Sequence, residues 1–133
     1  FEARTAALVA QYNQFCPLEG HCVNGQLALG ENIGDLAGLS MAWTAYQLSL
    51  GGKEAPVIDG VTGAQRFFLA WAQIWRSKSR EEALINQLRV GPHSPPQFRI
   101  NGVVRNIDAW YEAFGVTPED DLYLPPEERV RIW

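Results

Sequence analysis

The sequence predicts a mainly α fold in a single domain. Large apolar side chains recur at helical spacing in several stretches, and glycines or prolines separate these stretches. The chain has 133 residues, of which 47% are hydrophobic and 20% are charged, which is the composition of a folded chain rather than a disordered one. A length below about 150 residues favours one domain.

The first half of the chain predicts two helices. Apolar residues at helical spacing place one helix over about residues 2–15 and a second from Gly30 to Leu50. Residues 16–29 between them predict a loop or a weak hairpin with a tight turn at Asn24-Gly25. Gly51-Gly52 is expected to end the second helix and open a linker.

Two capping-box patterns predict the next helix starts. Thr62 with Gln65 starts a third helix, and Ser79 with Glu82 starts a fourth that runs to about Leu88.

The segment after the fourth helix is predicted to be non-helical because prolines 92, 95 and 96 interrupt it. Asn101-Gly102 lies between two short apolar runs, which predicts a hairpin-like segment over residues 98–105. Asn106 is expected to cap a last helix through Phe114, and Gly115 to end it. The tail to Trp133 reads as an extended strip.

Two cysteines lie six residues apart in the first loop. Cys16 and Cys22 favour a small disulfide ring, which suits an oxidising compartment. Two free thiols are an alternative. A metal pair with His21 would need further ligands at suitable spacing.

The charge pattern excludes one class of partner. The net charge is −4, and the 11 basic residues form no stripe beyond a short Arg76, Lys78, Arg80 cluster. Nucleic-acid binding needs such a basic surface, so no nucleic-acid partner is expected.

Two carboxylates at the start of the second helix are the first candidate for chemistry. Glu31 and Asp35 lie four residues apart and therefore face the same way. Acidic residues there also favour the positive end of the helix dipole, which is the purely structural interpretation. As a functional pair, one carboxylate would bind a metal ion and the other would orient a ligating imidazole. The small residues Gly34 and Gly38 predict a close neighbour for this helix.

A histidine and an arginine in the proline-containing segment are the second candidate. His93 and Arg99 stand near rigid backbone, which can hold donors for a developing oxyanion. A structural loop with a half-exposed histidine is the alternative. The tryptophans at helical spacing are interpreted as core residues rather than a ligand platform: Trp43, Trp71, Trp75 and Trp110.

These motifs together resemble a known family. Residues 30–39, GENIGDLAGL, resemble the ENxxDxxGL signature of the neprilysin and endothelin-converting-enzyme family of zinc metallopeptidases. His93-Ser94-Pro95 followed by Arg99 resembles that family's HSPxxxR segment. Segments 23–26 (VNGQ), 67–68 (FF) and 71–75 (WAQIW) and the Trp133 end are also similar. The resemblance covers essentially the whole chain and is nearest to bacterial oligopeptidases.

The resemblance implies a role for each site residue. Glu31 matches the third zinc ligand, and Asp35 matches the carboxylate that orients a zinc-binding histidine. His93 matches the residue that stabilises the tetrahedral oxyanion. Arg99 matches the residue that holds the substrate backbone and pairs with the signature aspartate. The implied reaction is hydrolysis of internal bonds in oligopeptides, with zinc polarising the carbonyl and activating water.

The sequence also departs from the family pattern. It has no H-E-x-x-H motif, which would supply two histidine ligands and the general base. Gly91 stands where the family often has an aspartate, and Val130 where animal relatives have a cysteine. The resemblance thus implies that residues 1–133 are the helical C-terminal portion of a thermolysin-like (gluzincin) catalytic domain, with the H-E-x-x-H half as its partner.

Several expectations follow for the whole protein and for this chain. The parent is expected to be a zinc endopeptidase that is secreted, periplasmic or at the cell surface. The chain alone is expected to be inactive, to bind zinc weakly at best, and to self-associate through apolar surface left uncovered. The alternative function is a non-catalytic helical binding module or inactive fragment.

Overall fold

Six α-helices and one short 3-10 helix form the computed structural model, which describes residues 1–133. In chain order the elements are α1 (Glu2–Tyr12), α2 (Leu29–Ser49), α3 (Gly63–Ile74), α4 (Glu81–Val90), α5 (Pro96–Val104), α6 (Asp108–Phe114) and η1 (Pro126–Glu128). Pairing between extended segments is limited to two isolated bridges. The predicted mainly α class is therefore confirmed.

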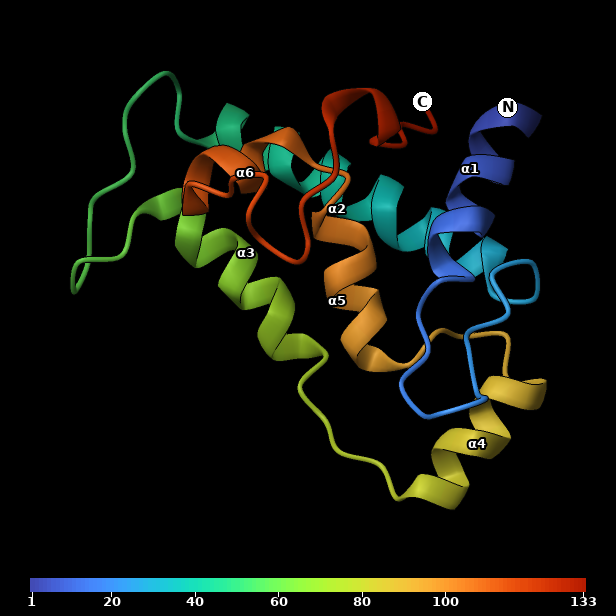
Figure 1. Cartoon of the computed structure of the whole chain (residues 1–133). Helices are drawn as coiled ribbons and strands as arrows, with labels where there is room; N and C mark the ends of the chain where they lie inside the picture. The colour runs from blue at the N-terminus through green and yellow to red at the C-terminus, as the bar shows by residue number, and fades with distance from the viewer.

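Helix α2 is the central helix of the fold. It packs against α5 and α1, while α3 packs against α6 and α5 (Figure 1). Helix α4 follows α3 after a connection over residues 75–80 and contacts the core through Leu84 and Leu88 (Figure 1). The two ends of the chain lie close together, and the ring of Phe1 stacks on that of Trp133. No helix combines the length and the apolar character needed to cross a membrane.

The core lies where α1, α2 and α5 meet. Tyr12 and Val103 are fully buried, and the Tyr12 hydroxyl donates to the Phe98 carbonyl at 3.2 Å. A Cβ on Gly102 would stand 2.7 Å from the Tyr12 ring, so only glycine lets α1 and α5 approach this closely. The C-terminal end of α1 is thus fixed against α5.

Several predicted helix ends are confirmed. Thr62 and Gln65 form a complete capping box at the start of α3. Gly115 ends α6 in the left-handed conformation, with φ at 62°. The predicted second helix matches α2 within one residue at each end. The first helix is shorter than predicted, because the chain turns after Tyr12 and the Phe15 carbonyl accepts from the Val23 amide.

The loop after α1 is closed by a disulfide between Cys16 and Cys22, as the spacing favoured. Both cysteines are used, so the free-thiol and metal-pair alternatives are wrong.

The predicted hairpin-like segment over residues 98–105 is wrong. Residues 98–104 lie in α5, which begins directly after Pro95, and Arg105 is its C-cap. Pro95 is the N-cap and Pro96 occupies the first turn, where a proline loses no helical hydrogen bond and its fixed φ suits the helix. Asn101-Gly102 is inside the helix, because packing against Tyr12 outweighs its turn preference.

Two predicted caps are also wrong. Ser79 does not cap α4: the helix starts after Arg80 without a side-chain cap, and Glu81 and Glu82 lie in its first turn. Acidic side chains there stabilise the helix start through the dipole. Asn106 does not cap α6. Its side chain instead forms hydrogen bonds with Gln11, the Gly102 carbonyl and the Val130 amide. These bonds join the extended C-terminal strip, residues 129–133, to α1 and α5.

One face of α2 has no partner in this chain. Met41 is 64% exposed and Leu48 is 76% exposed. A Cβ built on Gly34 or Gly38 would meet no atom within 4 Å. The close neighbour predicted from these glycines is therefore not part of residues 1–133.

Candidate functional site

The candidate site forms where the start of α2 meets the start of α5 and the loop before it. Glu31 and Asp35 project from neighbouring turns of α2, as their spacing predicted. Arg99 projects from the first turn of α5 and contacts both carboxylates. His93 approaches Glu31 from the loop between α4 and α5. The structure thus brings together all four residues that the sequence singled out.

A two-pronged ion pair joins the two helices. Arg99 Nε donates to Asp35 Oδ2 at 2.6 Å, and Arg99 Nη2 donates to Asp35 Oδ1 at 2.7 Å. The side chains are 13% and 8% exposed, so the pair is largely shielded from water. The hydrogen bond with Asp35 raises the pKa of Arg99, although burial acts in the opposite direction. Bidentate charged pairs of this kind fix geometry as well as contributing energy.

Glu31 forms the open side of the cluster. Its Oε2 lies 3.2 Å from Arg99 Nη2, and its Oε1 lies 3.4 Å from His93 Nε2. The Glu31 and His93 side chains are 44% and 49% exposed. Asp35 is therefore the buried anchor of the cluster, while Glu31 and His93 remain accessible.

Two tryptophans of the chain, Trp71 and Trp75, contact Arg99. The Arg99 guanidinium lies 3.8 Å from the centre of the Trp75 ring, a cation–π contact. Trp71 Nε1 donates to the Arg99 carbonyl at 3.3 Å. Interpreting the tryptophans only as core is thus incomplete. Trp43, Trp71 and Trp110 are half-buried against the core, whereas Trp75 also stacks on a site residue.

Tyr12 is buried next to the site and contacts α5. Its ring is fully buried, and burial raises the pKa of its hydroxyl well above the ordinary value. The negative charge of Asp35 adds to this rise. The hydroxyl therefore stays protonated and keeps its bond to the Phe98 carbonyl, one residue before Arg99.

The loop that carries His93 is bound to α2 by a buried hydrogen bond. Ser94 Oγ donates to Asn32 Oδ1 at 2.8 Å, and both residues are 1% exposed. Gln87 of α4 adds an exposed bond to the His93 carbonyl at 3.2 Å. Sequence reasoning passed over Asn32 and Ser94 as partners, although both stand inside the two motifs that it quoted.

These residues fit part of a zinc site but not a whole one. Glu31 is an accessible carboxylate at the mouth of the cluster, and carboxylate oxygen is an accepted zinc ligand. No group of three or more potential ligand residues occurs in the chain, whereas a catalytic zinc ion needs about three protein ligands. Any further ligands must therefore come from outside residues 1–133.

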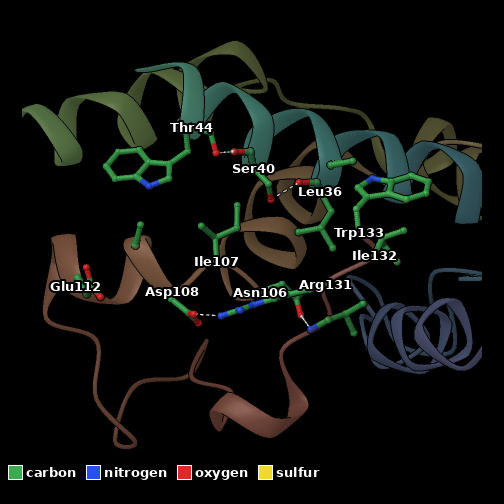
Figure 2. A pocket seen from close by; sticks show the side chains of 14 residues that line it. Leu36, Ser40, Thr44, Asn106, Ile107, Asp108, Glu112, Arg131, Ile132 and Trp133 are labelled. Atoms are coloured by element: carbon green, nitrogen blue, oxygen red, sulfur yellow. Dashed lines mark hydrogen bonds and ion pairs between the residues drawn. The ribbon is translucent and has the colours of Figure 1, made fainter. Parts of the chain in front are cut away.

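A separate hollow lies on another face of α2. It has a volume of about 500 Å³ and lies between α2, α6 and the C-terminal strip (Figure 2). Ser40 and Thr44 line it, but their hydroxyls bond to backbone carbonyls of their own helix. None of the four site residues lines it, so this hollow is distinct from the polar cluster.

Comparison with known proteins identifies the class of protein as a metallopeptidase segment. The family model "Peptidase family M13" matches residues 1–130, and the chain belongs to this family. It is 36% identical to human neprilysin and 35% identical to bovine endothelin-converting enzyme 1, over its full length in both cases.

Solved structures agree with this assignment. The Mycobacterium tuberculosis zinc metalloprotease Zmp1 in complex with an inhibitor is 59% identical over 99% of the chain, with a TM-score of 0.96. PepO from Lactobacillus rhamnosis is 38% identical over the whole chain, with a TM-score of 0.81. The helical structure fits a mainly α C-terminal portion of a catalytic domain of this family. The chain spans 18% of the length of human neprilysin and 21% of the Zmp1 chain.

The ion-pair geometry predicts that Asp35 stabilises the fold more than Glu31 does. Asp35→Asn leaves a shielded guanidinium without its main partner, and we expect it to lower the free energy of unfolding by about 2–3 kcal/mol. Glu31→Gln, the matched control on the same arginine, should cost less than about 1 kcal/mol because Glu31 is half-exposed. Urea unfolding of both variants measures the difference. Equal losses would contradict this division between the two carboxylates.

Proposed function

We propose that this chain is the C-terminal segment of a zinc metalloendopeptidase that hydrolyses oligopeptides. One observation carries the proposal: Glu31, Asp35, His93 and Arg99 converge in one half-open cluster, although 68 residues separate Glu31 from Arg99. Membership of peptidase family M13 supports the reaction class. Because the chain spans about a fifth of its solved relatives, the activity belongs to the whole protein.

Glu31 is proposed as one zinc ligand. The other two ligands would be the histidines of the H-E-x-x-H half of the catalytic domain, called the missing half below. The half-exposed position of Glu31 at the mouth of the cluster supports this role. Zinc, when bound, polarises the substrate carbonyl and activates a water molecule. In this chain Glu31 also lies between two cationic or potentially cationic side chains, Arg99 and His93, which hold its carboxylate in place.

Asp35 is proposed to orient an imidazole of the missing half. Each carboxylate oxygen has two lone-pair sites, so Asp35 can accept more than the two hydrogen bonds it receives from Arg99. A ligating histidine commonly donates its second ring N–H to such a carboxylate. The pairing with Arg99 fixes the Asp35 carboxylate in one orientation before the imidazole arrives.

His93 and Arg99 are proposed to act on the peptide. The His93 imidazole is half-exposed beside Glu31 and can donate to an oxyanion that develops near the zinc ligand. Arg99 uses Nε and Nη2 on the two carboxylates, while its Nη1 makes no hydrogen bond within the chain. Nη1 is therefore free to hold a carbonyl of the substrate backbone.

The missing half of the catalytic domain is the proposed partner of the open face of α2. A helix with apolar residues on both sides is typical of a protein interior. The uncovered side of α2 carries Gly34, Gly38, Met41 and Leu48.

The Cys16–Cys22 disulfide supports a secreted, periplasmic or cell-surface location. A non-catalytic helical module is the alternative, and the upstream sequence distinguishes the two through the presence or absence of H-E-x-x-H.

In the full-length protein, Glu31→Ala and His93→Ala should behave differently. Glu31→Ala removes a ligand, so bound zinc and peptidase activity are expected to fall together. His93→Ala removes a transition-state contact, so kcat should fall about 100-fold or more while zinc stays bound. Metal analysis and steady-state kinetics on a quenched peptide provide both readouts. Equal loss of zinc in the two variants would contradict the roles proposed here.

The isolated chain should show no zinc-dependent peptidase activity. It supplies one proposed ligand and no H-E-x-x-H general base. The measurement is turnover of a quenched peptide with and without added zinc and chelator. Robust turnover that a chelator abolishes would overturn the proposed division between this chain and its missing half.

The isolated chain should also self-associate through the open face of α2. Sedimentation velocity should show an average mass that rises with concentration, because the exposed apolar side chains gain burial by pairing. Met41→Glu is expected to weaken association. Val90→Glu, on the exposed side of α4, is the control and should leave association unchanged. A monomer at every concentration would refute the prediction.

A further inference from the structure

A buried polar pair lies directly behind the exposed contact between His93 and Glu31. Ser94 donates to Asn32 across a separation of 62 residues, and each side chain is 1% exposed. Asn32 follows Glu31 in the chain, and Ser94 follows His93. Two adjacent residues on α2 thus face two adjacent residues on the loop, one pair in the interior and the other at the surface.

We propose that the Asn32–Ser94 hydrogen bond is a latch that positions the His93 imidazole beside Glu31 for catalysis. Asn32 and Ser94 are positioning residues in this proposal, since they act through their neighbours and not on the substrate. The inference rests on the proposed function, and it extends that function to two residues with no assigned role.

The other polar contacts of the His93 loop are exposed and weak. The His93 contact with Glu31 is 3.4 Å long and half-exposed, and exposed polar contacts of this kind contribute little. The Gln87 bond to the His93 carbonyl is also exposed. Helix α4, which precedes the loop, contacts the core through Leu84 and Leu88, but it makes no polar contact with α2. The bond between Asn32 and Ser94 is therefore the one shielded hydrogen bond between the loop and α2.

The backbone carries the position of Ser94 to His93. Ser94 precedes Pro95, and a residue before proline is restricted to extended conformations. Pro95 and Pro96 then lead into α5, which is held on α2 by the Arg99–Asp35 pair. Ser94 is therefore fixed by its bond to Asn32 and by the proline that follows it. Because His93 directly precedes Ser94, the position of Ser94 also limits the position of His93.

The unpaired atom of Asn32 argues against a role as simple filler. Asn32 Nδ2 is buried and has no hydrogen-bond partner. An unpaired buried donor is destabilising, and an apolar side chain at this position would avoid that cost. The bond to Ser94 is the one hydrogen bond that the Asn32 side chain makes in this chain, and an apolar residue at position 32 would leave Ser94 Oγ without its acceptor.

The test compares latch variants of the full-length protein with a matched control. The variants are Ser94→Ala, Asn32→Ala and the double variant. The control is Ser40→Ala, because the Ser40 hydroxyl on α2 bonds only to the Leu36 carbonyl of its own helix. The readouts are kcat, KM, bound zinc, affinity for a tetrahedral phosphonate peptide, and hydrogen exchange of the peptide covering residues 91–94.

A catalytic latch predicts a specific pattern. Each single variant should lower kcat about tenfold or more, with KM within about threefold of wild type and zinc content unchanged. Phosphonate affinity should fall by the same factor as kcat/KM. The double variant should equal the single variants, because both remove one bond. Exchange over residues 91–94 should accelerate in the latch variants and stay unchanged in Ser40→Ala.

Other outcomes overturn the latch. A wild-type kcat for the folded, zinc-loaded variants would show that the pair stabilises the fold without positioning His93. Unchanged exchange over residues 91–94 would show that the bond does not hold the loop. If wild-type protein shows no zinc-dependent activity, the proposed function fails, and the exchange result alone then decides whether the latch holds the loop.

Discussion

The ion pair between Asp35 and Arg99 is the interaction on which the rest of the site depends. It joins α2 to α5 with two short hydrogen bonds in a shielded position. Trp75 covers the guanidinium, and Tyr12 supports the turn of α5 that carries it. Every other element of the cluster is placed relative to this pair. The loop with His93 enters α5 just before Arg99, and Glu31 lies one turn of α2 before Asp35.

Burial distinguishes the two carboxylates of α2. Asp35 satisfies an arginine in the interior, where an unpaired charge would be destabilising. Glu31 receives the weaker second contact from the same arginine and keeps much of its surface accessible. Spacing alone could not separate these roles, because residues four apart on a helix are equivalent until the packing partner is known. The position of α5 therefore turns a symmetric pair into a buried anchor and an accessible carboxylate.

Some local signals were confirmed, although the capping-box pattern at Ser79 was not. The capping box at Thr62 and the glycine stop at Gly115 were confirmed because each satisfies backbone groups within a few residues. The α5 segment was mispredicted because the turn preference of Asn101-Gly102 is outweighed by the contact of Gly102 with Tyr12, 90 residues earlier in the chain. Asn106 was mispredicted for the same reason: its partners are Gln11 and Val130, which no local pattern reveals.

The candidate site was more predictable than the fold around it. The site residues were singled out by their spacing and by the family resemblance, and they do converge in space, but their supports were not visible in the pattern. Trp75, Tyr12 and the Asn32–Ser94 bond come from elements that meet only when the chain folds. Catalytic groups need fixed orientations, and orientation is set by such tertiary contacts. A sequence motif therefore names the groups that can react, while buried neighbours from distant segments determine where those groups point.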